Sequence, residues 1–245
     1  MFFDGTAEAN SSVEVFIDGI SIGTTTADGA GDWTFDHTGT TLADGPYSIT
    51  AQATDVALNV GAVSVGSALT VDTTAPVAPT IDSVSTDSGD SATDEVTNDN
   101  TPTITGTAEA GSFVEVSLDA VTIGTVTADG AGNYSITPVS PIADGVYTVA
   151  ATSTDSAGNS TTTTATDFLT VDTTAPTVAI TSDQGTGGDI LFDTESPATL
   201  TFTLSEDSTT FALGDISVIG SGTLANFMMV SASVYTVEYL SLIHI

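Results

Sequence analysis

The side chains in this sequence that could do chemistry are almost all carboxylates. The 245 residues include 32 Asp and Glu, no Lys or Arg, no Cys and two His, which gives a formal net charge of −32. Carboxylate, carbonyl and hydroxyl oxygens are the ligands that Ca²⁺ and Mg²⁺ prefer, whereas zinc favours thiolates and imidazoles. The composition therefore indicates hard divalent cations as ligands, with screening by bulk salt as the alternative.

The same composition excludes several classes of function. Without Lys or Arg, nothing can neutralise the phosphates of a nucleic acid, and without Cys there is no thiol nucleophile or disulfide. No base is placed to activate a Ser or Thr, so we expect no enzyme activity. No apolar run is long enough to span a bilayer. Residues 1–4 do not resemble a signal peptide, so an internal segment of a longer protein is expected.

The acids lie in a tandem repeat. The segment LTVDTTAP occurs at residues 69–76 and again at 169–176, and each copy is typical of a last strand that runs into a short linker stopped by Pro. The predicted domains are 1–76 (truncated at its N-terminal side), 77–176 (complete), 177–239 (divergent and truncated at its C-terminal side), and 240–245, a non-native tail or the start of an apolar strand.

Short alternating segments predict an all-β fold. Seven strands are expected in the complete copy, at 80–85, 101–108, 113–119, 121–127, 133–138, 146–154 and 162–171. That number in about 100 residues favours tandem immunoglobulin-like β-sandwiches joined by short linkers. The predicted core residues are Ile104, Val114, Val116, Ile123, Tyr134, Ile136, Tyr147, Val149 and Leu169. The first copy has no counterpart of 77–100, and the third domain is expected to form strands at 200–207, 211–218 and 235–239.

Strand order predicts where the acids gather. In an antiparallel sandwich, the connections after strands two, four and six lie at the end where the chain enters, here called the entry pole; the opposite end is the exit pole. At the entry pole these connections carry Glu109, Asp129 and Asp155, and the linker adds Asp72. At the exit pole, the loop 86–100 carries Asp87, Asp90, Asp94, Glu95 and Asp99, and the next linker adds Asp172.

Several oxygens at one pole predict Ca²⁺ ions at the domain junctions, because like charges repel and hard cations take several oxygen ligands. The predicted metal ligands are Asp72, Glu109, Asp129, Asp155, Asn159, Glu8, Asp28, Asp55, Asp87, Asp94 and Asp172. The alternative is that Asp in these Gly-containing turns serves only the local turn. His37, isolated in the sequence, is expected on the surface, and Trp33 and Tyr134 are expected in the core and not as a sugar-binding platform.

The residues also carry a family resemblance. Residues 101–160, TPTITGTAEAGSFVEVSLDAVTIGTVTADGAGNYSITPVSPIADGVYTVAATSTDSAGNS, followed by LTVDTTAP, resemble the bacterial Ig-like repeats of giant RTX and biofilm-associated surface adhesins exported by type I secretion. Residues 177–239 are similar to a second Ig-like module, marked by SED and FALGDISV.

The resemblance implies a non-catalytic extender on the bacterial cell surface. It implies neighbouring Ig-like domains as partners, stiffening by Ca²⁺, and a role in cell adhesion and biofilm. Two alternatives stay open: a carbohydrate- or surface-binding Ig-like module, and an accessory module of a large secreted hydrolase.

Overall fold

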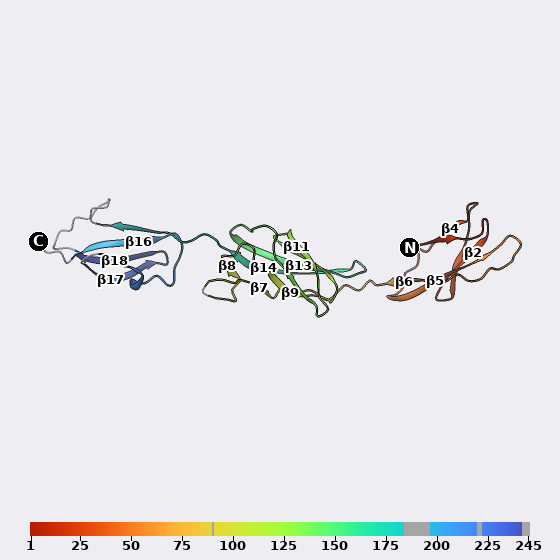
Figure 1. The fold of residues 1–245 in the computed structure, drawn as a ribbon, viewed down its shortest axis with the longest axis horizontal. Coiled ribbons are helices and arrows are strands. Elements are labelled where there is room, and N and C mark those ends of the chain that lie inside the picture. The colour runs from red at the N-terminus through yellow and green to blue at the C-terminus, as the bar shows by residue number, and fades with distance from the viewer. Residues whose placement is uncertain (90, 184–196, 220–221, 242–245) are drawn as a thin grey trace. The chain divides into compact units, whose positions relative to one another are not determined.

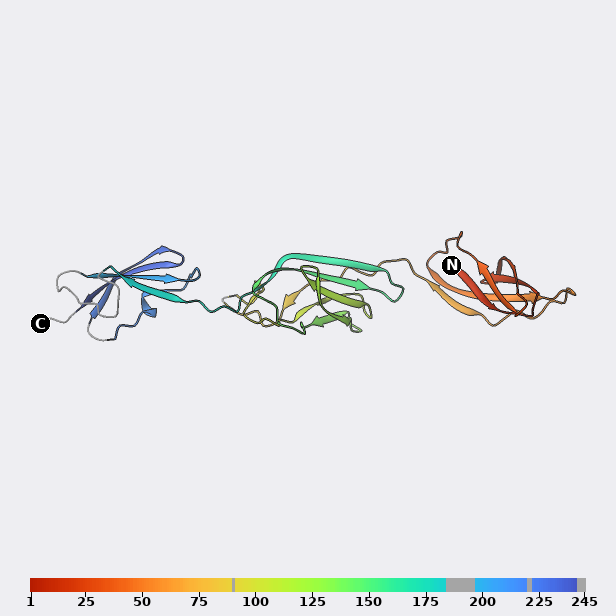
Figure 2. The same ribbon diagram turned by 90° about the horizontal axis from the view of Figure 1, so that it is seen from above.

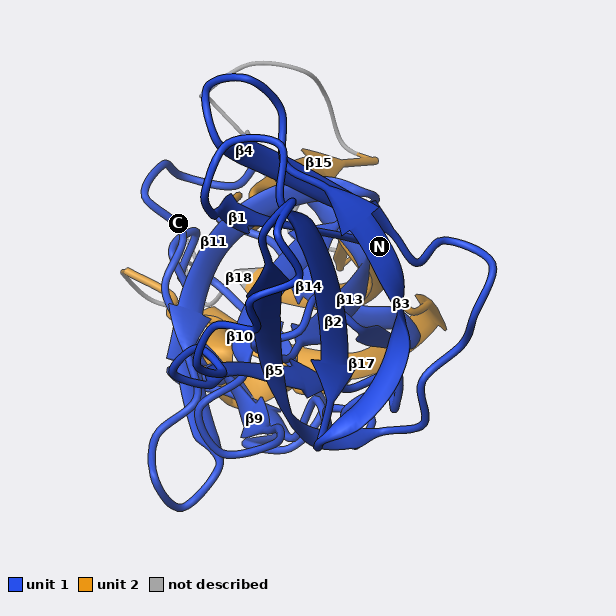
Figure 3. Ribbon diagram, turned by 90° about the vertical axis from the view of Figure 1, so that its right-hand side faces the viewer, with its two compact units in different colours: residues 1–173 blue, residues 174–245 orange. Residues whose placement is uncertain are grey.

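The computed structural model describes residues 1–89, 91–183, 197–219 and 222–241, and its chain divides into two compact units, residues 1–173 and 174–245 (Figure 3). The described residues form strands and a single 3₁₀ turn, which confirms the prediction of an all-β chain (Figure 1). Among them, no helix is both long enough and apolar enough to cross a bilayer.

The second repeat, in residues 77–173, is a sandwich of two sheets with strand orders β12-β9-β7 and β11-β10-β13-β14-β8 (Figure 2 gives a second view). Its strands are β7 Ser83–Val84, β8 Val96–Thr97, β9 Ile104–Thr107, β10 Phe113–Leu118, β11 Val121–Thr127, β12 Asn133–Ile136, β13 Gly145–Thr154 and β14 Ser160–Val171. All seven predicted strands are present, although the first of them is shortened to β7. The short strand β8 was not predicted, and it pairs in parallel with the end of β14.

The core of this sandwich follows the alternation of its strands. In β10, Val114 and Val116 are fully buried while Phe113 and Glu115 face outward, because successive strand residues point to opposite faces. All nine predicted core residues belong to this cluster or pack against it, so that prediction is confirmed. At the start of β13 the Tyr147 hydroxyl donates to the Ala143 carbonyl oxygen at 2.8 Å, the arrangement that fixes this corner in Ig-like domains.

The first repeat has the same plan with fewer strands. Its strands are β1 Phe2–Thr6, β2 Ser12–Ile17, β3 Ile20–Thr26, β4 Asp32–Asp36, β5 Gly45–Thr54 and β6 Ser67–Val71. They form a β1-β4 sheet and a β3-β2-β5-β6 sheet. Within the described residues β1 pairs with β4 alone, whereas its counterpart β9 lies between β12 and β7.

In the unit that begins at Thr174, the described residues form a sheet of order β15-β16-β18-β17. Its elements are β15 Val178–Ser182, β16 Ala198–Leu204, the 3₁₀ turn η1 Leu213–Asp215, β17 Gly222–Ser231 and β18 Val234–Ser241. Phe202, Tyr235 and Val237 form the centre of its core. Leu240 continues β18 by pairing with Thr223, while residues 242–245 of the expected tail lie outside the described residues.

The predicted strand at 211–218 is wrong. The segment folds over the sheet, and Phe211 places its ring 4.9 Å from that of Tyr235. The turn is fixed by Asp215, whose carboxylate accepts from the Ala212 amide at 2.8 Å. The local acceptor Asp215 and the packing of the half-buried Phe211 ring therefore decide the fold of this segment, and its alternation does not.

Candidate functional site

The aspartates predicted at the entry pole bond to the backbone of their own turns. Asp129 accepts from the amides of Ala131 and Asn133 at 2.9 and 2.8 Å. Asp155 accepts from the Asn159 amide at 2.9 Å and, through its other oxygen, from the Asn159 side-chain nitrogen at 2.8 Å. The pKa of each carboxyl is lowered, chiefly by the hydrogen bond from the Asn133 amide and from the Asn159 side chain respectively.

The first repeat contains the same turns. Asp28 accepts from the Ala30 amide at 2.8 Å, and Asp55 from the Asn59 amide at 2.8 Å. Hydrogen bonds from Asp32 and from the Asn59 side chain are the main reasons that the pKa values of Asp28 and Asp55 are lowered. These acids accept turn hydrogen bonds. That they also bind Ca²⁺ stays a prediction.

The loops at the entry pole contact each other. In the second repeat, the Ala108 amide donates to the Gly132 carbonyl at 2.8 Å, which joins the loop of Glu109 to that of Asp129. Gly132 has φ +87°, and a Cβ there would lie 2.6 Å from the Ala108 oxygen. Only glycine fits this position, and the equivalent loop of the first repeat has the same geometry around Gly31.

The second repeat holds the linker that precedes it through three side chains. The Asn159 side-chain nitrogen donates to the Asp72 carbonyl oxygen at 3.1 Å, and the Thr161 hydroxyl donates to the Pro76 carbonyl oxygen at 2.9 Å. The Glu109 carboxylate accepts from the Val77 amide at 3.3 Å. Sequence reasoning therefore placed Glu109, Asn159 and the linker at the same pole correctly, and it missed Thr161.

The first repeat holds the other end of the same linker through Asp44. One carboxylate oxygen accepts from the amide and hydroxyl of Thr73 at 3.0 and 2.8 Å, and the other accepts from the Thr74 hydroxyl at 2.7 Å. These hydrogen bonds lower the pKa of Asp44, and the bond from the Thr74 hydroxyl contributes most. We call the bonds of the linker to Asp44, Glu109, Asn159 and Thr161 the junction contacts.

The same bond pattern begins at the next linker, where Asp144 accepts from the amide and hydroxyl of Thr173 at 3.0 and 2.8 Å. Asp44 and Asp144 were not among the predicted site residues. The signal for them was in the sequence: each belongs to an ADG segment that lies 29 residues before the first Thr of its DTTAP linker.

The predicted metal ligands do not form a ready cation site in the described part of the chain. There, no group of three or more His, Asp or Glu side chains is placed to hold a metal ion. The Asp72 carboxylate accepts from the Thr74 amide at 3.0 Å, so it too bonds within its own turn. Ca²⁺ at the entry pole would have to take oxygens from these turns, and it stays a prediction.

The acidic loop at the exit pole lies beside the outgoing linker, since the Asp172 amide donates to the Thr97 carbonyl at 2.9 Å. One oxygen of Asp87 accepts from the amides of Asp94 and Glu95 at 3.1 and 3.2 Å. Its other oxygen is buried without a hydrogen-bond partner among the described residues. Such an oxygen is suited to a cation or a water molecule. Asp90 lies outside the described residues.

The prediction of His37 as a surface residue is wrong. The side chain is 9% exposed, and its ring contacts those of Phe3 and Phe35 with centroids 5.9 and 6.2 Å apart. Trp33 and Tyr134 are 8% and 3% exposed, which confirms that they are core residues. Neither offers a face on which a sugar could stack.

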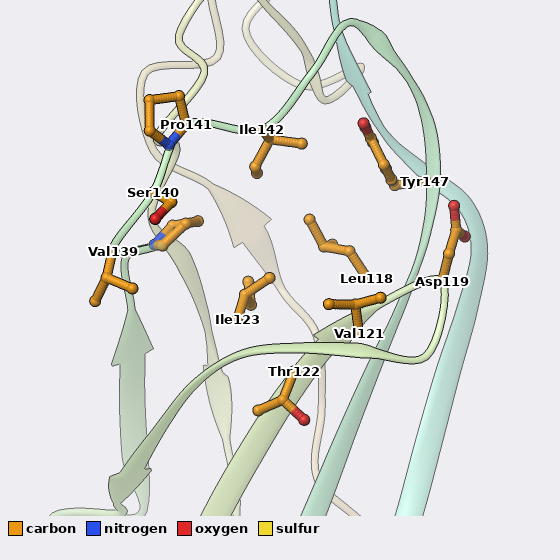
Figure 4. A pocket seen from close by; sticks show the side chains of 11 residues that line it. Leu118, Asp119, Val121, Thr122, Ile123, Val139, Ser140, Pro141, Ile142 and Tyr147 are labelled. Carbon is orange, nitrogen blue, oxygen red and sulfur yellow. The ribbon is translucent and has the colours of Figure 1, made fainter.

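The second repeat also carries an apolar cavity of about 390 Å³ between the β10–β11 hairpin and the segment before β13 (Figure 4). Leu118, Ile123 and Ile142 point into it. Asp119 is the acid in its lining, and its carboxylate accepts from the Thr148 amide at 3.0 Å. The lining is therefore mainly apolar, and its acidic side chain already accepts a backbone hydrogen bond.

Comparison with protein-family models gives one description for residues 2–240 and confirms the predicted tandem of Ig-like domains. A model described as a bacterial Ig-like domain matches residues 2–73 and again 74–173. A second model with that description matches residues 172–240. A search of curated proteins finds no match.

The chain is also similar to solved structures at low identity. A tetra-tandem repeat in the extending region of a large adhesion protein is 23% identical, with a TM-score of 0.36, over 83% of this chain and 52% of that one. A 1.5-MDa bacterial ice-binding adhesin is 20% identical, with a TM-score of 0.38, over 97% and 78%. The BSP domain of a biofilm associated protein is 21% identical, with a TM-score of 0.29, over 71% and 28%. The chain thus spans about half of the first of these structures.

Proposed function

We propose that this chain, which belongs to the family of bacterial Ig-like domains, is a non-catalytic extender segment of a larger secreted adhesin on the bacterial cell surface. The observation that carries the proposal is the set of junction contacts. The linker of residues 72–77 is bonded by Asp44 on one side and by Glu109, Asn159 and Thr161 on the other. A linker held along its length supports a spacing role.

The junction contacts would act by restricting the linker. A free peptide of this length samples many backbone conformations, and ordering each residue costs about 1–2 kcal/mol of conformational entropy. Hydrogen bonds from both repeats offset part of that cost, and Pro76 reduces it by fixing one dihedral angle. Copies of the same sequence at 69–76 and 169–176 would repeat this restraint along an array.

The proposal is tested by removing the Asp44 contacts. In the full chain, Asp44→Ala should free Thr73 and Thr74, so small-angle scattering in EGTA should give a broader distance distribution and a smaller radius of gyration than the wild type. Asp32→Ala is the matched control, since it removes the same charge from an exposed residue outside the junction. If Asp44→Ala and Asp32→Ala both scatter like the wild type, the junction contacts do not set the extension.

Ca²⁺ at the junctions is a further part of the proposal. It is supported by the net charge of −32 without a basic residue, and by the contacts of Asn159 with Asp72 and of Glu109 with Val77 at the two ends of the linker. Metal that binds only the ordered junction would also stabilise it by mass action. The triple variant Asp72→Ala/Glu109→Ala/Asp155→Ala should then lose the rise in Tm that low-millimolar Ca²⁺ gives the wild type. If NaCl of the same ionic strength raises the Tm of the wild type equally, the stabilisation comes from screening by bulk salt and not from specific Ca²⁺ binding.

A further inference from the structure

A groove runs along one side of the second repeat, between β11 and β12, the outermost strands of its two sheets. It consists of three adjoining hollows of about 390, 540 and 500 Å³. Ile123 and Val139 line both the first and the second hollow, and Val126 and Ser135 line both the second and the third. All seven strands expected of this repeat are present, so the groove belongs to a complete sandwich.

The two ends of the groove differ in chemistry. At the end beside the β10–β11 hairpin, Leu118, Ile123 and Ile142 point into the first hollow, which is mainly apolar (Figure 4). The third hollow, at the other end, is lined by the carboxylates of Asp82 and Asp129. A ligand that complements the groove is therefore apolar at one end and positively charged at the other.

The edge of β12 that borders the groove carries unpaired backbone groups. Across the β9–β12 pair, the Ala108 amide donates to the Gly132 carbonyl at 2.8 Å. Hydrogen-bonded residues alternate along an antiparallel strand, so the even-numbered residues of β12 bond to β9. Ser135, and Thr137 directly after the strand, therefore direct their N–H and C=O groups to the edge at the groove.

The first repeat closes the same gap with a side chain. Its Thr25 hydroxyl, in β3, donates to the Thr34 carbonyl, in β4, at 2.8 Å. The repeat offset of 101 residues maps this pair onto Val126 and Ser135. Since Val126 has no hydroxyl, it cannot donate to the Ser135 carbonyl, and that acceptor is left for a partner.

We propose that the groove binds an extended segment of another protein as an added strand antiparallel to β12. In this mode of recognition, main-chain pairing supplies affinity and the side-chain hollows supply specificity. Because β12 runs from the acidic end of the groove to the apolar end, the segment is apolar at its N-terminal side and carries Lys or Arg at its C-terminal side.

The charge at the acidic end decides which partner fits. A second copy of this chain cannot supply the basic residues, because the sequence contains no Lys or Arg. The partner is therefore a different protein. The inference depends neither on the extender role nor on the junction contacts.

The test titrates the full chain with the peptide acetyl-LVTVTKK-amide at about 0.15 M NaCl in a calorimeter. We expect saturable binding of one peptide per chain and slower hydrogen exchange at Ser135 and Thr137. The neutral peptide acetyl-LVTVTSS-amide should bind more weakly. Asp82→Asn should weaken binding of the Lys peptide and leave binding of the Ser peptide unchanged, because Asp82 acts through its charge.

A substitution taken from the first repeat separates strand pairing from attraction by charge alone. Val126→Thr should give the Ser135 carbonyl the internal donor that Thr25 gives Thr34, and so weaken binding by about fivefold, the usual contribution of one hydrogen bond. Val146→Thr is the matched control, because Val146 is exposed on β13 and does not line the groove.

Three results would overturn the proposal. The first is a Lys peptide that shows no saturable binding, or that binds without slowing exchange at Ser135 and Thr137. The second is equal affinity of the Lys peptide for Val126→Thr and Val146→Thr, which would mean that its attraction to the net negative charge explains the binding. The third is equal affinity of the Lys and Ser peptides for the wild type.

Discussion

Aspartate side chains in this protein find their partners among backbone amides and hydroxyls. Asp155 uses both carboxylate oxygens on Asn159, and Asp44 uses both on Thr73 and Thr74. Hydrogen bonds to an ionised carboxylate are stronger than those between neutral groups, and they keep it charged by lowering its pKa. In a chain with no Lys or Arg, this is how an acid can be ordered without an ion pair.

Tyr134 is the residue in the second repeat that ties the segment 77–86 to the core. Its hydroxyl donates to the Thr80 carbonyl oxygen at 2.5 Å. Burial, helped by the nearby charge of Asp82, raises the pKa of Tyr134 to about 12. Because the folded pKa is above the unfolded value, its contribution to stability is complete below about pH 10 and is lost as the pH rises toward 12.

We predict that Tyr134→Phe lowers the free energy of unfolding by about 1 kcal/mol at neutral pH, the usual net contribution of one hydrogen bond. The variant should also lose less stability than the wild type between about pH 10 and 12, because it has no phenol to ionise there. Chemical denaturation at pH 7 and pH 11 measures both effects. Equal alkaline losses in the two proteins would show that other groups cause the loss.

At the scale of elements, the two repeats differ mainly at the edge that β7 occupies. Gly106 of β9 lies under both the Thr80 carbonyl and the Tyr134 ring, and a Cβ there would meet the Tyr134 hydroxyl at 2.6 Å. The position of the segment 77–86 therefore depends on the absence of a side chain at Gly106. The equivalent Gly5 lies under the ring of Trp33.

We predict that Gly106→Ala detaches β7 from β9 and destabilises the second repeat by about 1–3 kcal/mol, the usual cost of overpacking. Hydrogen exchange at residues 80–85 should become faster, while exchange in β10 and β13 changes little. Gly130→Ala is the control, because a Cβ at Gly130 would meet nothing within 4 Å. Unchanged exchange at 80–85 in Gly106→Ala would contradict this account of the edge.

The elements that could be predicted from the sequence are those whose burial follows a local period. The strands of the second repeat and its core, from Ile104 to Leu169, follow from alternation because each strand has one buried face. β8 could not be found in this way, since its two residues pair with β14 only through tertiary contact. The segment 211–218 alternates, but its fold is set by the Asp215 carboxylate and by the packing of the half-buried Phe211 ring against the core.

The same distinction applies to the candidate site. Strand counting placed Glu109 and Asn159 beside the linker, because the pole of each connection follows from topology. It did not show which carboxylate oxygens already accept hydrogen bonds from their own turns. For Asp129 this depends on the local turn geometry, which strand counting does not describe. Asp44 was missed because its partners lie 29 and 30 residues away, at a distance that only the pairing of β5 with β6 brings close.

At the scale of the whole molecule, the stability of the folded chain is reduced by repulsion among charges of one sign. With a net charge of −32, the folded chain repels itself, and salt should relieve that repulsion. The screening length falls from about 30 Å at 0.01 M to about 3 Å at 1 M ionic strength. Most acids here are exposed and therefore screened, whereas the short hydrogen bonds of the Asp turns are much less sensitive to salt.

Acid has opposite effects on the charge repulsion and on the hydrogen bonds of the Asp turns. Protonation removes repulsion, but it also removes the acceptors of the turns. The pKa is lowered at Asp28, Asp36, Asp44, Asp55, Asp99, Asp129 and Asp155. Because these folded pKa values are below the unfolded ones, their stabilisation is present above about pH 4 and is lost as the pH falls through the folded values.

Measurements at low and high salt distinguish the effect of charge repulsion from that of the turn hydrogen bonds. At pH 7, raising NaCl from about 0.01 M to about 1 M should raise Tm by several degrees, because it screens the repulsion. Lowering the pH from 7 to about 2.5 should then reduce Tm more at 1 M NaCl than at 0.01 M, since at high salt no repulsion is left to relieve and only the loss of the turn bonds remains. Calorimetry over this grid of pH and salt measures both. If the acid-induced fall is equal at the two salt concentrations, the turns and not the overall charge set the stability of the chain.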